Sequence, residues 1–128
     1  MNKVIVKDIM IRNIHTIRPE AKIALARLKM LRYGVGALPV VDDNDVLVGI
    51  LTLRDIDLAG ELTNDLFAED LMSTNLITKS ESTSIIEIAK TMSESSIQRI
   101  PIIDKNGKLV GLVTQSVIIR SLITDTTH

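Results

Sequence analysis

The sequence repeats itself at a fixed offset of 62 positions. Residues 8–58 align with residues 70–120 without a gap, and the segment GILTLRDI at 49–56 returns as GLVTQSVI at 111–118. Identical pairs include Asp8 and Asp70, Met10 and Met72, Thr16 and Thr78, Pro39 and Pro101, and Thr52 and Thr114. A unit of about 60 residues buries little surface alone, so we expect the two copies to pack face to face and share a core.

Both copies predict the same order of elements. Copy one, residues 1–61, reads as an extended piece at 14–17, a helix at 19–32, strands at 37–41 and 46–51, and a helix after Thr52. Copy two, residues 62–128, repeats this order at 76–79, 81–94, 100–103 and 109–113, with a helix after Thr114. Pro19 and Ser80 are expected to begin the first helix of each copy, and Asn106-Gly107 predicts a hairpin turn. The predicted fold class is α/β, with two tandem β-α-β-β-α repeats packed with pseudo-two-fold symmetry.

Composition excludes several classes of function. The 15 basic and 16 acidic residues nearly balance, which argues against binding to nucleic acid. The chain has no cysteine, so disulfides, thiol catalysis and cysteine-bound zinc are excluded, and a reducing, cytoplasmic location is expected. No apolar run approaches the roughly 18–20 residues of a membrane span, so no membrane association is expected.

Thr52 and Asp55 allow two interpretations. In the first they form a capping box, in which each side chain bonds a backbone N–H group at the start of a helix. In the second, the same hydroxyl and carboxylate hold a diol and attract a phosphate beside the exposed N–H groups. The spacing alone favours the capping box. Copy two keeps Thr114 but has Val117 in place of the acid, so a helix can start there without the full box.

The segments LPVVD and IPIID, each followed by a hairpin and by LVGILT or LVGLVT, resemble the CBS domain family. The resemblance covers nearly the whole chain and matches the tandem arrangement called a Bateman module. It implies a non-catalytic regulatory protein that binds AMP, ADP, ATP or S-adenosylmethionine in the cleft between its repeats. It also implies a homodimer that signals to an unidentified partner protein. No cofactor is required, although Mg²⁺ can accompany ATP.

The resemblance also implies ligand-binding residues. In the family's ribose-binding motif, Asp55 would accept both ribose hydroxyls, Thr52 would contact sugar or phosphate, and Arg54 would meet phosphate. The strong site comprises Thr52, Arg54, Asp55, Leu76, Ile77, Thr78, Ile97, Gln98 and Pro101. A second site comprises Ile14, His15, Thr16, Val35, Gly36, Arg99 and Thr114. Because Val117 cannot accept a hydrogen bond, we expect this second site to be weak, empty or differently used.

Other interpretations stay open at this point. A fold with unused clefts would serve as a dimerisation or assembly scaffold, and the altered motif of copy two favours this. Exposed aliphatic side chains at Val117, Ile118 and Leu122 would support dimerisation. An enzyme is not expected, because Asp55 has no base, nucleophile or metal partner in the sequence. The run Asp42–Asp45 lacks the glycine and glutamate of a calcium loop, so it predicts a solvated turn and no metal site.

Overall fold

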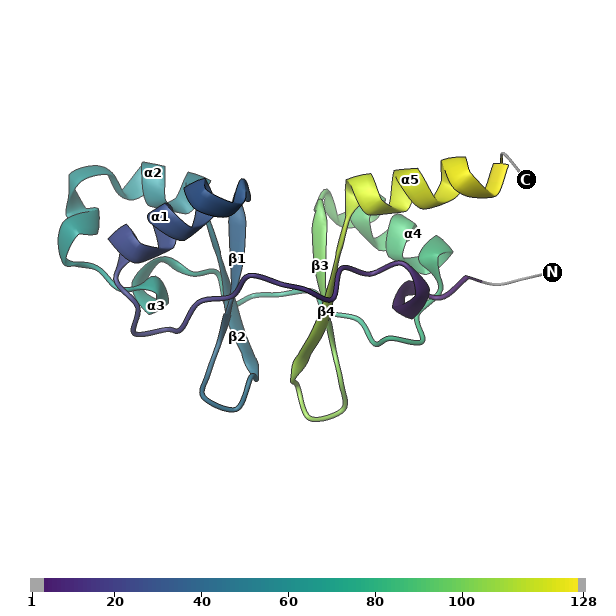
Figure 1. Cartoon of the computed structure of the whole chain (residues 1–128), viewed down its shortest axis with the longest axis horizontal. Helices are drawn as coiled ribbons and strands as arrows, with labels where there is room; N and C mark the ends of the chain where they lie inside the picture. Colours follow the sequence, from purple (N-terminus) through teal and green to yellow (C-terminus); the bar gives the residue numbers. More distant parts are fainter. Residues whose placement is uncertain (1–3, 127–128) are drawn as a thin grey trace. The chain divides into compact units, whose positions relative to one another are not determined.

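The computed structural model describes residues 4–126, with the side chains of all of these except residues 62–64 and 124–126. Its elements are η1 (Val6–Asp8), α1 (Ile23–Tyr33), β1 (Ala37–Val41), β2 (Leu47–Thr52), α2 (Leu53–Ala59), η2 (Gly60–Asp65), α3 (Ala68–Leu71), α4 (Ile85–Ser95), β3 (Arg99–Ile103), β4 (Leu109–Thr114) and α5 (Gln115–Thr126). β1 pairs with β2, and β3 with β4, each as an antiparallel hairpin. Figure 1 shows α1 and α2 to one side of the first hairpin, and α4 and α5 to one side of the second. The predicted α/β fold class is confirmed.

The first predicted strand of each copy is shorter than expected. It contributes one parallel bridge to the following hairpin, from Ile17 to Val40 in copy one and from Lys79 to Ile102 in copy two. Each repeat therefore has a β-β-α order after its first helix, with a two-stranded sheet rather than a three-stranded one.

The chain forms two compact units. The continuous unit is His15–Leu76, and the composite unit joins Met1–Ile14 to Ile77–His128. The segment that leads into copy one thus packs with copy two, and the segment that leads into copy two packs with copy one. The repeat boundaries at 61 and 62 concern the duplication and stay a prediction, whereas these units describe the packing.

We call residues 4–14 and 62–76, which lead into the two copies, the exchanged segments. Equivalent contacts hold both of them in place. In the composite unit Ile11 forms an antiparallel bridge with Leu112. In the continuous unit Ser73 forms the same kind of bridge with Ile50. Ser73 and Ile50 are the repeat counterparts of Ile11 and Leu112, so the exchange is reciprocal.

Met10 and Met72 occupy the space above the two motif glycines. A Cβ atom added at Gly111 would lie 2.2 Å from the Met10 sulfur. A Cβ atom added at Gly49 would lie 2.5 Å from the Met72 sulfur and 3.0 Å from the Ser73 carbonyl oxygen. Packing against the exchanged segment therefore accounts for each glycine without any ligand.

Each unit has an aliphatic core of its own, so the expectation of one core shared by the two copies was wrong. The buried cluster of the continuous unit is Ile17, Ile23, Ala26, Met30, Leu38, Val40, Leu51, Ile56 and Ala68. The buried cluster of the composite unit is Val6, Met10, Ile85, Ile88, Met92, Ile100, Ile102, Val113 and Ile118. Both clusters lack aromatic side chains, as the 2% aromatic content of the sequence predicts. The exchanged segments supply core residues to each unit, Val6 and Met10 to one and Ala68 to the other.

Pro19 and Ser80 do not begin the helices, so this prediction was wrong. α1 begins at Ile23 and α4 at Ile85. The preceding residues form turns instead, closed by Ala21 N–H to Arg18 O and by Thr83 N–H to Ser80 O, each at 3.1 Å. The exchanged segments bond to these turns, through Glu69 N–H to Pro19 O (2.9 Å), Ala68 N–H to Ala21 O (2.8 Å) and Val6 N–H to Thr83 O (2.8 Å). The cap of α4 is Ser84, whose hydroxyl accepts the N–H of Glu87 at 3.2 Å.

The two hairpin turns have the same geometry. Asp42 and Asp104 each accept two backbone N–H groups of their own turn, at 2.8 and 3.0 Å. Gly107 has a φ of +81°, and Asp45, its repeat counterpart, has a φ of +63°. The hairpin predicted from Asn106-Gly107 is confirmed, and the Asp42–Asp45 run forms the same kind of turn.

Candidate functional site

The candidate site of copy one lies at the start of α2. β2 ends at Thr52, whose extended backbone (φ −111°, ψ 155°) leads directly into the helix. The Asp55 N–H donates to Thr52 Oγ1 at 3.1 Å, and the Thr52 N–H donates to Asp55 Oδ2 at 3.3 Å. This is the capping box that the spacing favours, and it fixes both side chains at the N-terminal end of the helix.

The capping box leaves acceptor capacity on Asp55. The 3.3 Å bond to Thr52 is long, because backbone N–H···O bonds cluster near 2.9–3.0 Å. Asp55 is half-buried and forms no ion pair with the residues that the structure describes. A carboxylate offers about four lone-pair sites. Asp55 can therefore accept further hydrogen bonds from hydroxyl groups without leaving its helix.

Two neighbours of Thr52 belong to the predicted sites. The Leu53 N–H donates to the Gly36 carbonyl at 2.9 Å, which places Gly36 of the predicted second site next to Thr52 of the strong site. The Arg54 side chain is exposed and forms no ion pair within the described part of the chain. The guanidinium is thus available to an anion near Asp55.

The equivalent position in copy two is a polar cavity of about 270 Å³. Its lining comprises Gln98, Arg99, Thr114, Gln115 and Ser116, none of which carries a carboxylate. Thr114 still caps α5, since its Oγ1 accepts the Val117 N–H at 3.3 Å. Gln115 and Ser116 were not predicted as part of the second site, although both lie inside the motif between Thr114 and Val117.

The predicted site residues fall into both units. The continuous unit contains His15, Thr16, Val35, Gly36, Thr52, Arg54, Asp55 and Leu76. The composite unit contains Ile14, Ile77, Thr78, Ile97, Gln98, Arg99, Pro101 and Thr114. Of these, the structure brings Gln98, Arg99 and Thr114 together around one cavity. The grouping of residues from the two units around one ligand stays a prediction.

Two residues of the predicted second site pack against the end of α1. The His15 ring stacks on Tyr33, with centroids 3.7 Å apart and planes 12° apart. The Thr16 carbonyl accepts a hydrogen bond from the Lys29 ammonium group. Neither Tyr33 nor Lys29 was singled out from the sequence as part of a site.

The predicted dimerisation face needs one correction. Ile118 is only 4% exposed and belongs to the core of the composite unit, and Val117 packs partly against that core. Leu122 is exposed as predicted, and Ile119 beside it is exposed too. The helix turns Ile118 inward because every third or fourth residue of α5 must face β4.

Charged side chains of the described residues stay at the surface. Their ion pairs include Arg18 with Asp43 at 2.9 Å and Arg27 with Asp57 at 3.5 Å. No group of three or more His, Asp or Glu side chains in the described part of the chain could hold a metal ion. None of the helices described here is long and apolar enough to cross a bilayer.

Comparison with known proteins gives consistent matches. The family model “CBS domain” matches residues 6–60 and 68–124. The “Uncharacterized protein MK0525” of Methanopyrus kandleri is 33% identical over 124 residues, which are 94% of this chain and 63% of that protein. The CBS domain pair of protein MJ0100, solved in complex with 5′-methylthioadenosine and S-adenosyl-L-methionine, has a TM-score of 0.86 and 31% identity, and the match covers 97% and 99% of the two chains. CBSX2 in complex with AMP has a TM-score of 0.86 and 26% identity over 95% and 98%.

Two of the related sequences are covered only in part. The chain spans 63% of MK0525 and 22% of the inosine-5′-monophosphate dehydrogenase of Thermoplasma acidophilum. Each of the two family matches falls on one copy of the internal repeat, and together they span most of the sequence. The chain therefore belongs to the CBS domain family and carries two CBS domains in tandem.

Proposed function

We propose that this chain is a non-catalytic regulatory module that binds an adenosyl compound through Asp55. The observation that carries the proposal is the half-buried Asp55 carboxylate, which has one long bond to Thr52 and no ion pair among the described residues. A ribose presents two adjacent hydroxyl donors, and the two oxygens of one carboxylate can accept both. MJ0100 in complex with S-adenosyl-L-methionine and CBSX2 in complex with AMP support this class of ligand.

Arg54 favours a phosphate-bearing ligand. Its exposed guanidinium is one residue before Asp55 and has five N–H donors that match phosphate oxygens. AMP, ADP and ATP are therefore the preferred candidates, and S-adenosylmethionine, which lacks a phosphate, is the next. Mg²⁺ would arrive with ATP rather than be held by the protein.

We expect the site of copy two to bind such ligands more weakly. Hydrogen bonds to a charged acceptor contribute about 1.5–3 kcal/mol each, so the loss of two at Val117 costs about 3–6 kcal/mol. That corresponds to about two to four decades of affinity. Arg99 restores one phosphate contact, which does not replace both lost bonds.

A regulatory role requires that the ligand bind two arrangements of the protein with different affinity. The signal would pass to an unidentified partner protein, with the module acting as a homodimer in the cytoplasm. Exposed apolar side chains in each unit, Leu31 and Leu58 in the continuous unit and Ile119 in the composite unit, support association with a second copy.

The test is thermal unfolding with AMP, ADP, ATP, S-adenosylmethionine and GTP. A ligand at 100 times its dissociation constant stabilises the fold by about 2.7 kcal/mol, which raises the Tm of a domain this size by roughly 10 °C. Asp55→Asn keeps an acceptor for the Thr52 N–H but should lose most of this shift. Asp57→Asn, the same change on the exposed side of α2, should keep it.

The second candidate function is an assembly scaffold. The observation that favours it is the completed capping box, which gives Asp55 a structural role without any ligand. If no adenosyl ligand shifts the Tm, the scaffold is supported instead. If a ligand shifts the Tm but Asp57→Asn abolishes the shift as fully as Asp55→Asn, Asp55 is not the specific anchor of that ligand. Calorimetric titration adds a stoichiometry, and two equally tight sites per chain would contradict a weak second site.

A further inference from the structure

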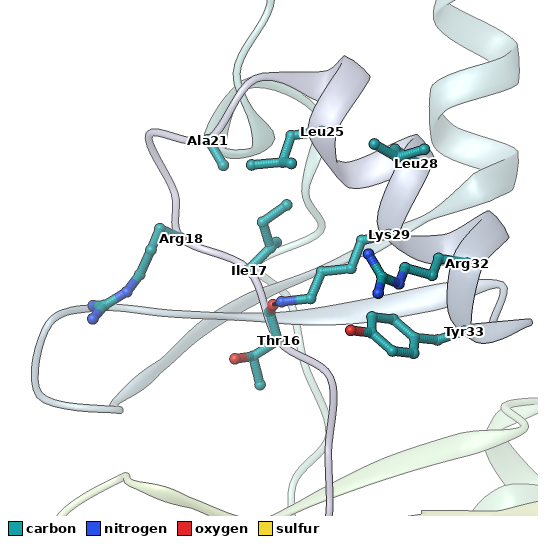
Figure 2. Close-up of a pocket in the computed structure, with 9 residues that line it drawn as sticks. All are labelled: Thr16, Ile17, Arg18, Ala21, Leu25, Leu28, Lys29, Arg32 and Tyr33. Atoms are coloured by element: carbon teal, nitrogen blue, oxygen red, sulfur yellow. Dashed lines mark hydrogen bonds between the residues drawn. The ribbon is translucent and has the colours of Figure 1, made fainter.

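A separate cavity lies along α1 and includes no residue of the α2 start. Its volume is about 420 Å³, within the range of small-molecule sites. Its floor is aliphatic and comprises Ile17, Ala21, Leu25 and Leu28. Leu25 and Leu28 are 54% and 60% exposed, so two leucines of one helix face water over this cavity. Figure 2 shows both leucines on α1 and Ile17 on the extended segment that precedes the helix.

Two cations and one aromatic ring border this floor. The Lys29 ammonium group donates to the Thr16 carbonyl and keeps two more N–H donors. The Arg32 guanidinium lies 5.8 Å from the centre of the Tyr33 ring. Stacking on His15 holds that ring in place. Polar donors therefore stand at fixed positions beside an apolar surface.

The border of the cavity is positively charged. None of its lining residues is Asp or Glu. The charge of Arg18 is satisfied by Asp43 at 2.9 Å, and Figure 2 shows Arg18 directed away from Lys29 and Arg32. Lys29 and Arg32 form no ion pair with any described residue. Two cations beside the aliphatic floor thus lack an anionic partner in the part of the chain that the structure describes.

The second copy shows that the fold does not require this chemistry. α4 begins and ends at the positions equivalent to those of α1, 62 residues later. At the positions of Leu25, Leu28, Lys29, Arg32 and Tyr33, copy two has Glu87, Lys90, Thr91, Glu94 and Ser95. The same helix forms with hydrophilic residues at all five of these positions, two of them acids. Helix formation therefore does not explain the apolar and cationic face of α1, and we look for a binding role instead.

We propose that this cavity binds a small amphipathic anion, a carboxylate with an aliphatic body. The aliphatic body lies on Leu25 and Leu28, and the carboxylate meets Lys29 and Arg32. Apolar burial and charge-assisted hydrogen bonds then act on the two ends of one molecule. A concave site of this volume suits a small molecule, whereas the more exposed Leu31, at 80%, lies outside the cavity lining. This site is independent of the adenosyl site at Asp55.

The chain carries its own reporter for the test. Tyr33 is the only tyrosine, and there is no tryptophan, so tyrosine fluorescence reports on this cavity alone. We expect a saturable change when sodium decanoate is added below its micelle concentration. Decan-1-ol has the same aliphatic body without the charge and should bind about 10- to 100-fold more weakly, the effect of losing a hydrogen bond to a charged group.

Variants that replace residues of α1 with their counterparts in copy two test which side chains bind decanoate. Arg32→Glu and Leu28→Lys should each weaken decanoate binding by about tenfold or more, with circular dichroism confirming the fold. Leu31→Ser, the copy-two residue at an exposed position outside the cavity, and Asp55→Asn should leave it unchanged. The proposal is overturned by the absence of a saturable change, by equal affinity for decan-1-ol, or by an equal loss in Leu31→Ser. The last result would indicate a contact between two copies of the chain.

Discussion

Position 55 and its repeat counterpart 117 show which part of the motif is needed to start a helix. Asp55 completes a capping box with Thr52, yet α5 starts equally well with Val117, because Thr114 alone accepts the Val117 N–H at 3.3 Å. A cap of this kind contributes about 0.5–2 kcal/mol, and most of that comes from the threonine hydroxyl. The acid is therefore dispensable for starting a helix at this position, which supports the ligand-binding role proposed for it in copy one.

At the same scale, we predict that Gly111→Ala destabilises the fold by about 1–3 kcal/mol, because its Cβ would lie 2.2 Å from the buried Met10 sulfur. Met10→Ala alone should cost about 2–5 kcal/mol. The double variant should cost less than the sum by about 0.5–3 kcal/mol, since removing the sulfur makes room for the methyl group. Urea unfolding of the four proteins measures this coupling.

The matched control pairs Met10→Ala with Gly49→Ala. A Cβ at Gly49 meets Met72 and the Ser73 carbonyl instead of Met10, so the two costs should add within about 0.5 kcal/mol. Strict additivity for Gly111 and Met10 would contradict the packing described here.

Among the elements, those with local determinants could be predicted from the sequence. The second hairpin follows from Asn106-Gly107, and α2 follows from Thr52 and Asp55, which lie within the segment that they shape. The starts of α1 and α4 could not be predicted in this way. The Pro19 carbonyl accepts a hydrogen bond from the Glu69 N–H, fifty residues along the chain. Sequence periodicity does not predict such a long-range bond.

The same reasoning explains which parts of the sites were found. The motif around Asp55 is contiguous, so resemblance to a family identified it. The contacts of His15 with Tyr33 and of Thr16 with Lys29 join an extended segment to the far end of a helix. Such contacts depend on where α1 begins, and the start predicted from the sequence was four residues too early.

The corrected start of α4 gives an element-scale prediction. Ser84→Ala should destabilise the protein by about 1 kcal/mol, because the hydroxyl accepts the Glu87 N–H at 3.2 Å. Ser80→Ala should change stability by less than about 0.5 kcal/mol, since Ser80 is exposed and its hydroxyl bonds only neighbouring hydroxyl groups among the described residues. Thermal unfolding of both variants decides the point. A larger cost for Ser80→Ala would place the functional cap four residues earlier.

For the whole molecule, the exchanged segments mean that residues close in sequence can belong to different packing units. Val6 is fully buried in the composite unit, although residues 15–76, which follow its segment in the sequence, form the other unit. Each unit therefore contains chain from both sides of the repeat boundary, and neither copy could be cut out without removing core residues from the other. The duplication explains why this arrangement is reciprocal, since both leading segments descend from one sequence pattern.

Amide hydrogen exchange can test directly with which unit the first leading segment packs. Val6→Ala should cost about 2 kcal/mol, because it opens a cavity at a side chain with 0% exposure. The faster exchange should appear in residues 77–126, far along the chain, and not in residues 15–60, which follow Val6 closely in sequence. Val40→Ala, an equally buried valine on β1 of the continuous unit, should give the opposite pattern. Local openings report the unit that has lost its packing. If Val6→Ala instead accelerates exchange mainly in residues 15–60, or if the two variants affect both units alike, the leading segments do not define separate packing units.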